Sequence, residues 1–350
     1  MNRTGLVYSM ECLKHKPYDG ILEVPERISA TIEHFKTTSL LDKLHLITPA
    51  PAEETDLMRV HSREHIDYVK GLSERGYVDF DIINPDIYVG ANTYNAALYA
   101  AGGVISAVKS TLGAETDNCF CLVRPPGHHA SSYPSGYCYF NNTAVAIRYA
   151  QQEYGIRKVA VFDWDAHAGN GTMKIFYNDP SVLTISVHRD PHEFFPGDGF
   201  VEQIGEGEGK GYCMNLPVPA GTGDADYVRI LDDYVLDAMR RFEPEALFVA
   251  AGQDSHLSDP LGELNVTVDG YVAMTQRLMA LADEVFGGRI ILALEGGYNI
   301  KTLPGIHQSI VETLLGLKGE VKIDGVAGKP TLDVLSELKR NLKGTPLALE

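Results

Sequence analysis

The sequence lacks the features of a membrane or secreted protein. Its apolar stretches are too short to cross a bilayer, and its mean hydropathy is −0.11. The first residues, Met1-Asn2-Arg3-Thr4, do not form the charged and then apolar segments that mark a secretory signal peptide. These absences predict a cytoplasmic protein with no membrane partner.

Positive charge is also scarce. The chain has 30 Lys and Arg residues against 47 Asp and Glu residues, which gives a net charge of −17 at pH 7. Because nucleic-acid binding needs a basic surface, this balance argues against a direct nucleic-acid partner. An acidic surface is compatible with cationic small substrates, although solubility alone also accounts for it.

Cysteine is sparse, and its spacing excludes one kind of metal site. The chain has five cysteines, an odd number, and none of their spacings forms a CxxC zinc knuckle. We expect reduced thiols that are buried or half-buried. They are Cys12, Cys119, Cys121, Cys138 and Cys213.

The order of hydrophobic patterns predicts an α/β fold. With 350 residues and 44% hydrophobic residues, the chain can form one large catalytic domain over residues 1–350. Short apolar runs alternate with helical patterns, which predicts a parallel sheet with helices on both faces. Expected strands are 118–123, 158–163, 181–187, 246–250 and 289–294. Expected helices are 91–110, 142–154, 225–242 and 268–286, with an amphipathic segment at 331–342 that docks or frays.

Acidic residues and a histidine follow two of the expected strands. Asp163, Asp165 and His167 come at the end of strand 158–163, and Asp254 follows strand 246–250. Ligands collect at the carboxyl ends of strands in open α/β sheets. An Asp/His/Asp set with an open position suits a metal that activates water. For Asp163, a helix cap or a buried salt bridge stays open.

Two adjacent histidines, His128 and His129, follow strand 118–123 on a Pro-Pro-Gly loop. Histidine is suited to proton transfer near neutral pH, although a histidine pair alone is equally typical of a surface turn. Asp163 and Asn170 on the metal loop are available to orient the two rings. The combination with strand-end metal ligands favours a catalytic pair.

Aromatic residues occupy further loops. Tyr298 follows strand 289–294, and a tyrosine hydroxyl can donate to a developing oxyanion. Tyr137 and Phe195 lie on other loops. Composition alone makes core packing as good an explanation of these two as the lining of a narrow substrate channel.

Together these segments resemble the histone deacetylase and acetylpolyamine amidohydrolase family from His15 to Tyr298. The Asp-Trp-Asp segment and Asn170 look like its class II branch and the bacterial and archaeal relatives of that branch. The resemblance implies an arginase-like or deacetylase-like α/β fold and zinc-dependent hydrolysis of an amide. The motifs that carry it are Pro25-Glu26-Arg27, Arg124-Pro125-Pro126-Gly127-His128-His129, Gly136-Tyr137-Cys138-Tyr139-Phe140-Asn141-Asn142, Asp163-Trp164-Asp165-Ala166-His167, Asp254 with Asp259-Pro260-Leu261-Gly262, and Glu295-Gly296-Gly297-Tyr298-Asn299.

The resemblance assigns two metal ions. Asp165, His167 and Asp254 match the ligands of one catalytic zinc ion. A structural potassium ion is expected by position at Asp163, Asp165, His167, Ser186 and Val187.

The resemblance also assigns catalytic roles. His129 matches the general base, and His128 matches its companion, which stays protonated or acts electrostatically. Asp163 matches the partner of His128, and Asn170 matches the residue that faces His129. Tyr298 matches the residue that polarises the scissile carbonyl, and its presence favours an active enzyme.

Substrate-binding positions follow in the same way. Tyr137, beside Gly136, and Phe195 match the walls of the substrate tunnel, and Asp86 matches a rim acid that grips the substrate backbone. Leu261 stands where polyamine-selective relatives often carry an acidic residue. This favours an acyl-lysine-type substrate, with an acetylpolyamine or a small acylated metabolite as the alternative.

Two positions depart from the usual family pattern. Ala168 stands where many relatives have a second histidine, so we expect altered packing and a retained metal. Gln253 replaces a more usual apolar residue before Asp254, which makes the floor of the site more polar.

Two rival functions stay open. An arginase-like hydrolase would need a second metal and a further aspartate after Asp254, where Ser255 and His256 stand instead. A metal-bound sensor of acyl groups would bind zinc without turnover. The sequence leaves the physiological substrate, the preferred acyl group and the oligomeric state open, and a homo-oligomer is compatible with it.

Overall fold

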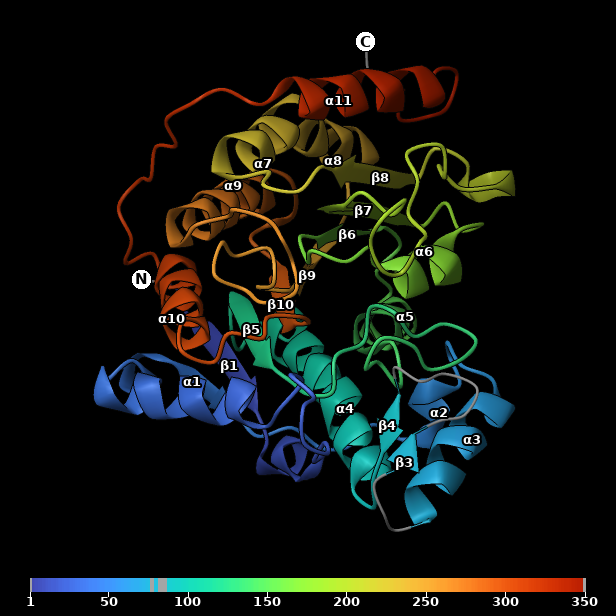
Figure 1. The fold of residues 1–350 in the computed structure, drawn as a ribbon, viewed down its shortest axis with the longest axis vertical. Coiled ribbons are helices and arrows are strands. Elements are labelled where there is room, and N and C mark those ends of the chain that lie inside the picture. Colours follow the sequence, from blue (N-terminus) through green and yellow to red (C-terminus); the bar gives the residue numbers. More distant parts are fainter. Residues whose placement is uncertain (1, 76–78, 81–86, 349–350) are drawn as a thin grey trace.

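An eight-stranded parallel sheet forms the centre of the computed structural model, which describes residues 2–75, 79–80 and 87–348 (Figure 1). Its strand order is β2-β1-β5-β10-β9-β6-β7-β8, and each adjacent pair runs parallel. A separate antiparallel pair consists of β3 (Asp79–Phe80) and β4 (Tyr88–Val89). The strands of the main sheet are β1 (Thr4–Tyr8), β2 (His45–Ile47), β5 (Asn118–Leu122), β6 (Val159–Asp163), β7 (Val182–Arg189), β8 (Cys213–Val218), β9 (Ala246–Ala251) and β10 (Ile290–Leu294).

Helices cover both faces of the sheet, as the sequence predicts (Figure 1). A π-helical turn, Leu231–Val235, joins α7 to α8, so the expected helix 225–242 is continuous but locally widened. The helices are α1 (Glu26–Thr37), α2 (Glu54–Leu57), α3 (Arg63–Glu74), α4 (Thr93–Leu112), α5 (Asn142–Tyr154), α6 (Asn170–Phe176), α7 (Asp224–Ile230), α8 (Leu236–Phe242), α9 (Val268–Phe286), α10 (Leu303–Leu314) and α11 (Lys329–Asn341).

The alternation of side chains along the strands divides the core into two layers. In β5, Phe120 and Leu122 pack in one layer with residues of α1, α9 and α10. Cys119 and Cys121 point the other way and pack with α4 and α5. Because residues two apart share a face of a strand, the sheet packs an apolar layer on each side. This makes it a rigid platform for the loops that leave its carboxyl edge.

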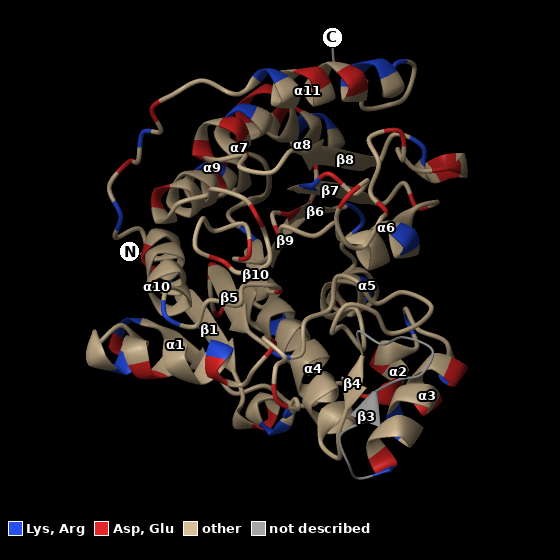
Figure 2. Ribbon diagram, viewed as in Figure 1, with Lys and Arg blue, Asp and Glu red and all other residues tan. Residues whose placement is uncertain are grey.

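The C-terminal helix α11 docks on the body. Leu335 and Leu338 of this helix are buried in the same layer as α9, so the amphipathic segment does not fray. Acidic and basic positions are interspersed along α11 and α3 (Figure 2). No helix within the described ranges combines the length and the apolar character that a bilayer span requires.

Candidate metal centre and active site

The site forms where five neighbouring strands, β5, β10, β9, β6 and β7, end at the same edge of the sheet. The register places Asp163 of β6 beside Ala250 of β9 and Ser186 of β7. The loops after β6 and β9 therefore start next to each other, which brings their polar side chains together. This confirms the expected placement of polar groups at the carboxyl edge.

Asp165, His167 and Asp254 meet at this edge. One potential ligand atom of each lies within 4.8 Å of the others. The Nδ1 atom of His167 is 3.1 Å from Oδ1 of Asp165 and 2.9 Å from Oδ2 of Asp254. Both carboxylates are buried. Two carboxylates and one imidazole are a ligand set that zinc accepts, with room for a fourth ligand.

Backbone groups hold the two carboxylates in place. The Gly296 amide donates to Oδ2 of Asp165 at 2.7 Å, and the Ala166 amide donates to Oδ1 of Asp254 at 2.8 Å. A Cβ atom on Gly296 would lie 2.2 Å from Asp254 Oδ2, so only glycine allows this approach.

The electrostatics of these carboxylates also suit a cation. Burial, and then the charge of Asp165, raise the pKa of Asp254 to about 7. Two buried carboxylates this close repel each other, and a bound divalent cation would remove that penalty. The three residues thus fit a zinc ion in both donor chemistry and charge.

The histidine pair lies beside the ligand set, with ring centroids 4.0 Å apart. Nδ1 of His128 is 3.0 Å from Oδ2 of Asp163, and Nδ1 of His129 is 2.8 Å from Oδ1 of Asn170. Both rings are buried. The structure therefore places the two imidazoles next to Asp163 and Asn170, the two orienting groups that were expected from the sequence.

The two imidazoles have opposite electrostatic environments. Burial lowers the pKa of His128, but the carboxylates of Asp165 and Asp163 outweigh it and hold that pKa well above its usual value. Burial, and then the positive charges of His128 and His167, hold the pKa of His129 well below its usual value. At neutral pH this arrangement gives one charged and one neutral imidazole, which is a division suited to acid–base chemistry.

Tyr298 is held at the site from two sides. Its amide donates to Oδ2 of Asp259 at 2.7 Å, and the guanidinium carbon of Arg27 lies 5.0 Å from the centre of its ring. Burial, and then the charge of Asp254, raise the pKa of its phenol well above the usual value. The hydroxyl stays protonated and can donate a hydrogen bond.

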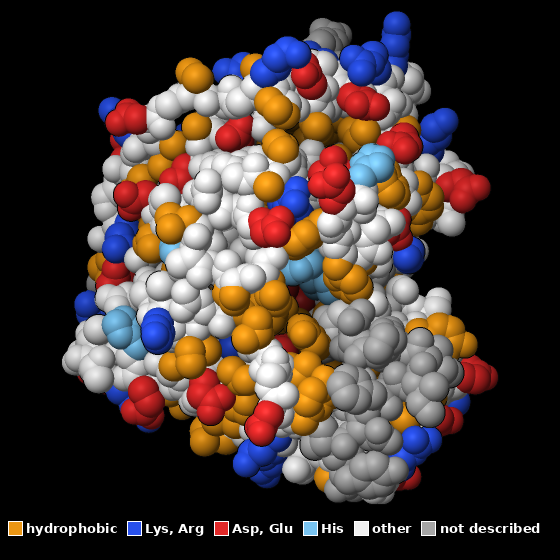
Figure 3. Space-filling view, viewed as in Figure 1, with side chains coloured by type: hydrophobic (Ala, Val, Ile, Leu, Met, Phe, Trp, Pro, Cys, Tyr) orange, Lys and Arg blue, Asp and Glu red, His pale blue; other side chains and the backbone are white. Residues whose placement is uncertain are grey.

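A cavity of about 200 Å³ opens onto these groups. Figure 3 shows a hollow near the middle of the drawn face, with histidine side chains inside it and hydrophobic side chains at its border. The cavity brings two of the expected catalytic residues, His129 and Tyr298, together with the expected tunnel residues. Its lining consists of His129, Gly136, Tyr137, His167, Phe195, Leu261 and Tyr298.

The cavity walls pack closely against the histidines. The ring centroid of Phe195 lies 5.1 Å from that of His129, and Tyr137 lies 6.2 Å from Tyr298. Gly136 has a φ of +50°, and a Cβ atom there would lie 2.5 Å from Cδ2 of His129. Asp86, the expected rim acid, lies outside the described residues.

The residues expected to hold potassium also lie close together. Asp163 and Ser186 are paired in register on β6 and β7, and both line a cavity of about 10 Å³. Oγ of Ser186 is 2.8 Å from Nδ1 of His188. Val187 follows Ser186 on β7 and is buried.

A buried cluster of charged side chains lies beside the site, and the sequence predicted no role for it. Oε1 of Glu23 accepts from Nη1 of Arg27 at 2.9 Å and from Nε of Arg124 at 2.7 Å. Arg27 also donates to the main-chain oxygens of Glu295 and Gly297, at 2.6 Å in the latter case. Apart from Glu23, the residues of this cluster lie in segments that the sequence analysis singled out. Their contacts could not be predicted from local spacing, because the hydrogen bond from Arg27 to Gly297 joins residues 270 positions apart.

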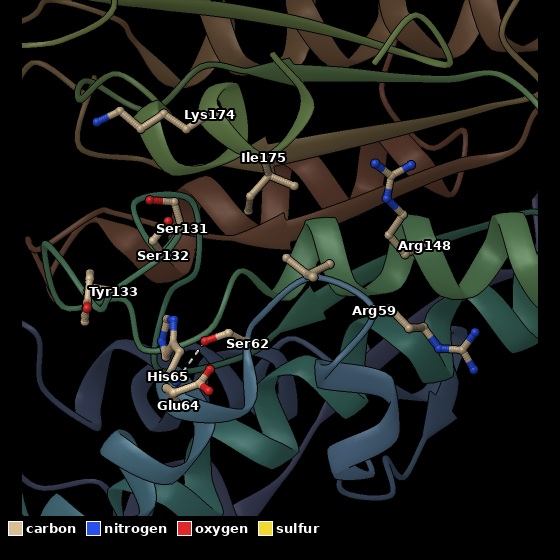
Figure 4. A pocket seen from close by; sticks show the side chains of 11 residues that line it. Arg59, Ser62, Glu64, His65, Ser131, Ser132, Tyr133, Arg148, Lys174 and Ile175 are labelled. Atoms are coloured by element: carbon tan, nitrogen blue, oxygen red, sulfur yellow. Dashed lines mark hydrogen bonds between the residues drawn. The ribbon is translucent and has the colours of Figure 1, made fainter. Parts of the chain in front are cut away.

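A larger cavity, of about 470 Å³, lies between α6 and the segment from Arg59 to His65 (Figure 4). Its basic side chains are each paired with a carboxylate: Arg59 with Glu153, Arg148 with Asp179 and Lys174 with Asp198. In Figure 4 these three cations point in different directions and do not converge on one point. This cavity therefore offers no concentrated charge for a ligand.

Comparison with known proteins agrees with this site. The histone deacetylase domain matches residues 21–314. The chain is 37% identical over 317 residues to a probable deacetylase of Archaeoglobus fulgidus, covering 89% of this chain and 86% of that protein. It is 36% identical over 304 residues to a histone deacetylase-like amidohydrolase of Pseudomonas aeruginosa, covering 87% and 79%.

The fold agrees as well. The crystal structure of the HDA15 HD domain superposes with a TM-score of 0.90 at 33% identity, over 99% of this chain and 96% of that one. The expected arginase-like or deacetylase-like fold is thereby confirmed. The sheet, the residues at its carboxyl edge and these matches lead to one assignment: the chain belongs to the histone deacetylase family of amide-hydrolysing enzymes.

Proposed function

We propose that this protein is a zinc-dependent deacetylase that removes acetyl or related acyl groups from acyl-lysine-type amines. The observation that carries the proposal is a cavity of about 200 Å³ whose lining includes His167 of the Asp/His/Asp set, His129 of the oriented histidine pair and Tyr298. Each group has a separate task in amide hydrolysis, and the cavity gives a substrate access to them.

Asp165, His167 and Asp254 would hold the zinc ion. A zinc ion there would supply Lewis acidity toward the acyl oxygen and toward water. Asp163, Ser186 and Val187, with Asp165 and His167, would hold the structural potassium ion.

His129 serves as the general base. Because its Nδ1 donates to Asn170, its Nε2 carries the free lone pair that takes a proton from the attacking water. His128, oriented by Asp163, stays protonated and stabilises negative charge at the site. As the carbon–nitrogen bond breaks, a proton from the histidine pair goes to the leaving amine, so the products are a carboxylic acid and a free amine.

Tyr298 donates its hydroxyl to the oxyanion that forms as water attacks the acyl carbon. Asp259 and Arg27 fix its backbone and its ring, so the donor is preorganised for this position. Such a group acts on the transition state more than on substrate binding.

The proposed substrate class is supported by the cavity lining. Tyr137, Phe195 and Leu261 form a largely apolar passage, and the described lining residues include no carboxylate side chain. The uncharged methylene chain of an acyl-lysine fits such a passage. A polyamine would have to bury an inner ammonium group without a partner, which is costly. An acetylpolyamine or small-metabolite substrate stays the second candidate, because the net charge of −17 attracts cations.

The test is release of acetate from an acetyl-lysine peptide by the zinc-loaded protein, with metal content measured on the same sample. A panel of acetyl-lysine peptides, acetylated polyamines and small acetylated metabolites, compared by kcat/KM, identifies the substrate class. A protein that binds zinc and releases nothing from any of them would instead be an acyl-group sensor, and the proposed function would be wrong.

We also propose a single domain, a cytoplasmic location and the absence of a direct nucleic-acid partner. Residues 1–350 form one catalytic domain, which the continuous eight-stranded sheet supports. A cytoplasmic location is supported by five unpaired thiols. The enzyme acts without direct nucleic-acid binding, in keeping with its acidic charge.

A further inference from the structure

Glu295 is a buried carboxylate at the carboxyl end of β10 that the proposed mechanism does not use. Its side chain is 0% exposed. Oε2 accepts hydrogen bonds from the Gly127 amide at 2.7 Å and from the His128 amide at 3.0 Å. One side chain from β10 thus holds the loop that follows β5, at the residues that begin the histidine pair.

The segment that carries Glu295 is itself fixed to the site. Arg27 donates to the main-chain oxygen of Glu295, and the next amide, that of Gly296, donates to Asp165. Glu295 therefore connects the backbone at the metal ligands to the backbone of the histidine loop.

The surroundings of Glu295 are unusual for a group that only satisfies two amides. Its other oxygen, Oε1, is buried and has no hydrogen-bond partner within the part of the chain that the structure describes. A carboxylate oxygen of Glu295, Sγ of Cys138 and a ring nitrogen of His128 lie within 4.8 Å of one another. The two amides need an oxygen acceptor at this place, so the position of the acceptor is the feature on which the histidine loop depends.

This cluster is not a second metal site. Nδ1 of His128 is committed to Asp163, and Oε2 of Glu295 is committed to two amides. Burial raises the pKa of Cys138 well above its usual value, so its sulfur is a thiol and not the thiolate that binds metals. The arrangement favours a role in positioning.

We propose that Glu295 is a positioning residue that sets the place of the His128 and His129 rings relative to the metal ligands through its bonds to the Gly127 and His128 amides. The inference rests on the proposed deacetylase function. Loss of the acceptor leaves two buried amides unsatisfied and lets the loop shift. Since a misplacement of about 1 Å in a catalytic group can cost about 10²-fold in rate, kcat responds while the binding cavity stays intact.

Three variants separate the contributions of Glu295. Glu295→Met has a similar length without an acceptor and is expected to lower kcat about 10²-fold, with KM and zinc content unchanged. Glu295→Gln keeps one carbonyl oxygen for the two amides and is expected to recover most of kcat. Glu295→Asp is one methylene shorter, cannot reach both amides and is expected to fall between them.

The matched control is Glu312→Met, on the outer helix α10, where the glutamate pairs with Lys318 away from the cavity. It is expected to keep full kcat. Each variant is measured as the zinc-loaded full chain with an acetyl-lysine peptide. Wild-type kcat in Glu295→Met would overturn the inference, and so would a drop in kcat that Glu295→Gln does not recover.

If Glu295→Met does not fold, Glu295→Asp decides: reduced kcat at unchanged KM supports positioning, and unchanged kcat overturns it. Failure of the proposed function is distinct, because then the wild-type protein itself releases no acetate.

Discussion

Asn170 accepts a hydrogen bond from His129, with Oδ1 of the amide 2.8 Å from Nδ1 of the ring. Asn170 is the first residue of α6, and His129 lies on the loop after β5, so two elements must pack correctly to make this contact. The contact fixes the tautomer of the base, because the ring nitrogen that donates to Asn170 cannot take a proton. It adds no charge, in contrast to the Asp163 contact of His128.

The first prediction compares the effects on kcat of two substitutions at this contact. His129→Ala removes the base and should lower kcat by about 10²–10⁴-fold. Asn170→Ala keeps the base but removes the group that orients its ring, so it should lower kcat clearly less than His129→Ala does. Both variants should keep their zinc. Steady-state kinetics and metal analysis check this, and wild-type kcat in Asn170→Ala would remove the orienting role.

The second prediction concerns the metal. Asp254→Ala removes one of three ligands, so bound zinc and activity should fall together. Asp324→Ala, which changes an exposed aspartate far along the chain, provides the control with the same change in charge. Zinc is counted by elemental analysis after dialysis against metal-free buffer. Full zinc occupancy in Asp254→Ala would show that the ligand assignment is wrong.

The third prediction concerns the oxyanion donor. Tyr298→Phe keeps the ring beside Arg27 and removes only the hydroxyl. Loss of one such donor costs about 10²–10³-fold in kcat. KM and zinc content should change little, because the hydroxyl acts on the transition state. An unimpaired kcat would take Tyr298 out of the mechanism.

Local patterns in the sequence were sufficient for the central strands. The strands β5, β6, β7, β9 and β10 are fully buried, and each contains apolar residues that the sequence pattern detects. Their expected ranges differ from the observed ones by at most two residues at either end. The edge strand β2 gave no signal, because it has three residues and two of them are exposed. Its existence depends on pairing with β1.

The site, like the sheet, has a part that the sequence predicts and a part that it does not. Asp165, His167 and Asp254 were predictable because strand ends in a parallel sheet converge on one edge. The support from Arg27 and Glu295 was not, since a hydrogen bond between residues 270 positions apart depends on the finished fold. Both residues lay in recognised motifs, but the hydrogen bonds by which they hold the site are made to main-chain groups, which a residue pattern cannot reveal.

The fourth prediction concerns stability and pH. Glu23 is buried between Arg27 and Arg124, and although burial opposes it, their charges lower its pKa to about 2. Because the folded pKa is below the ordinary value of 4.5, this stabilisation is present above pH 4.5 and is lost as the pH falls toward 2. Glu23→Gln leaves two buried cations without their counter-charge, so it should lower the free energy of unfolding at pH 7 by about 3–5 kcal/mol.

Urea titrations at several pH values check the fourth prediction. The difference between wild type and Glu23→Gln should narrow below about pH 4.5. Glu284→Gln breaks the exposed pair with Arg240 and should leave the urea midpoint nearly unchanged at every pH. A difference that stays constant as the pH falls would mean that the charge of Glu23 does not contribute.

The last prediction concerns selectivity at the rim. Wild-type protein should prefer acetyl-lysine peptides to acetylspermidine, because Leu261 offers no counter-charge to an inner ammonium group. Asp86, the expected rim acid, and the net charge of −17 act the other way, but surface charge is screened within about 8 Å at physiological salt, so the local rim should prevail. Leu261→Glu places a carboxylate at the cavity, where opposite charges about 4 Å apart near a protein surface attract by about 4 kcal/mol before desolvation. The ratio of kcat/KM should therefore shift toward acetylspermidine by about tenfold or more.

Leu257→Glu is the matched control for this shift. Leu257 is 54% exposed and does not line the cavity, so its substitution changes the net charge equally without changing the passage. If both variants shift the ratio alike, long-range charge and not the rim sets selectivity. If the wild-type protein already prefers acetylspermidine, the acyl-lysine proposal is wrong. The proposal of an amide-hydrolysing site would still hold, because that site depends on Asp165, His167 and Asp254 and not on Leu261.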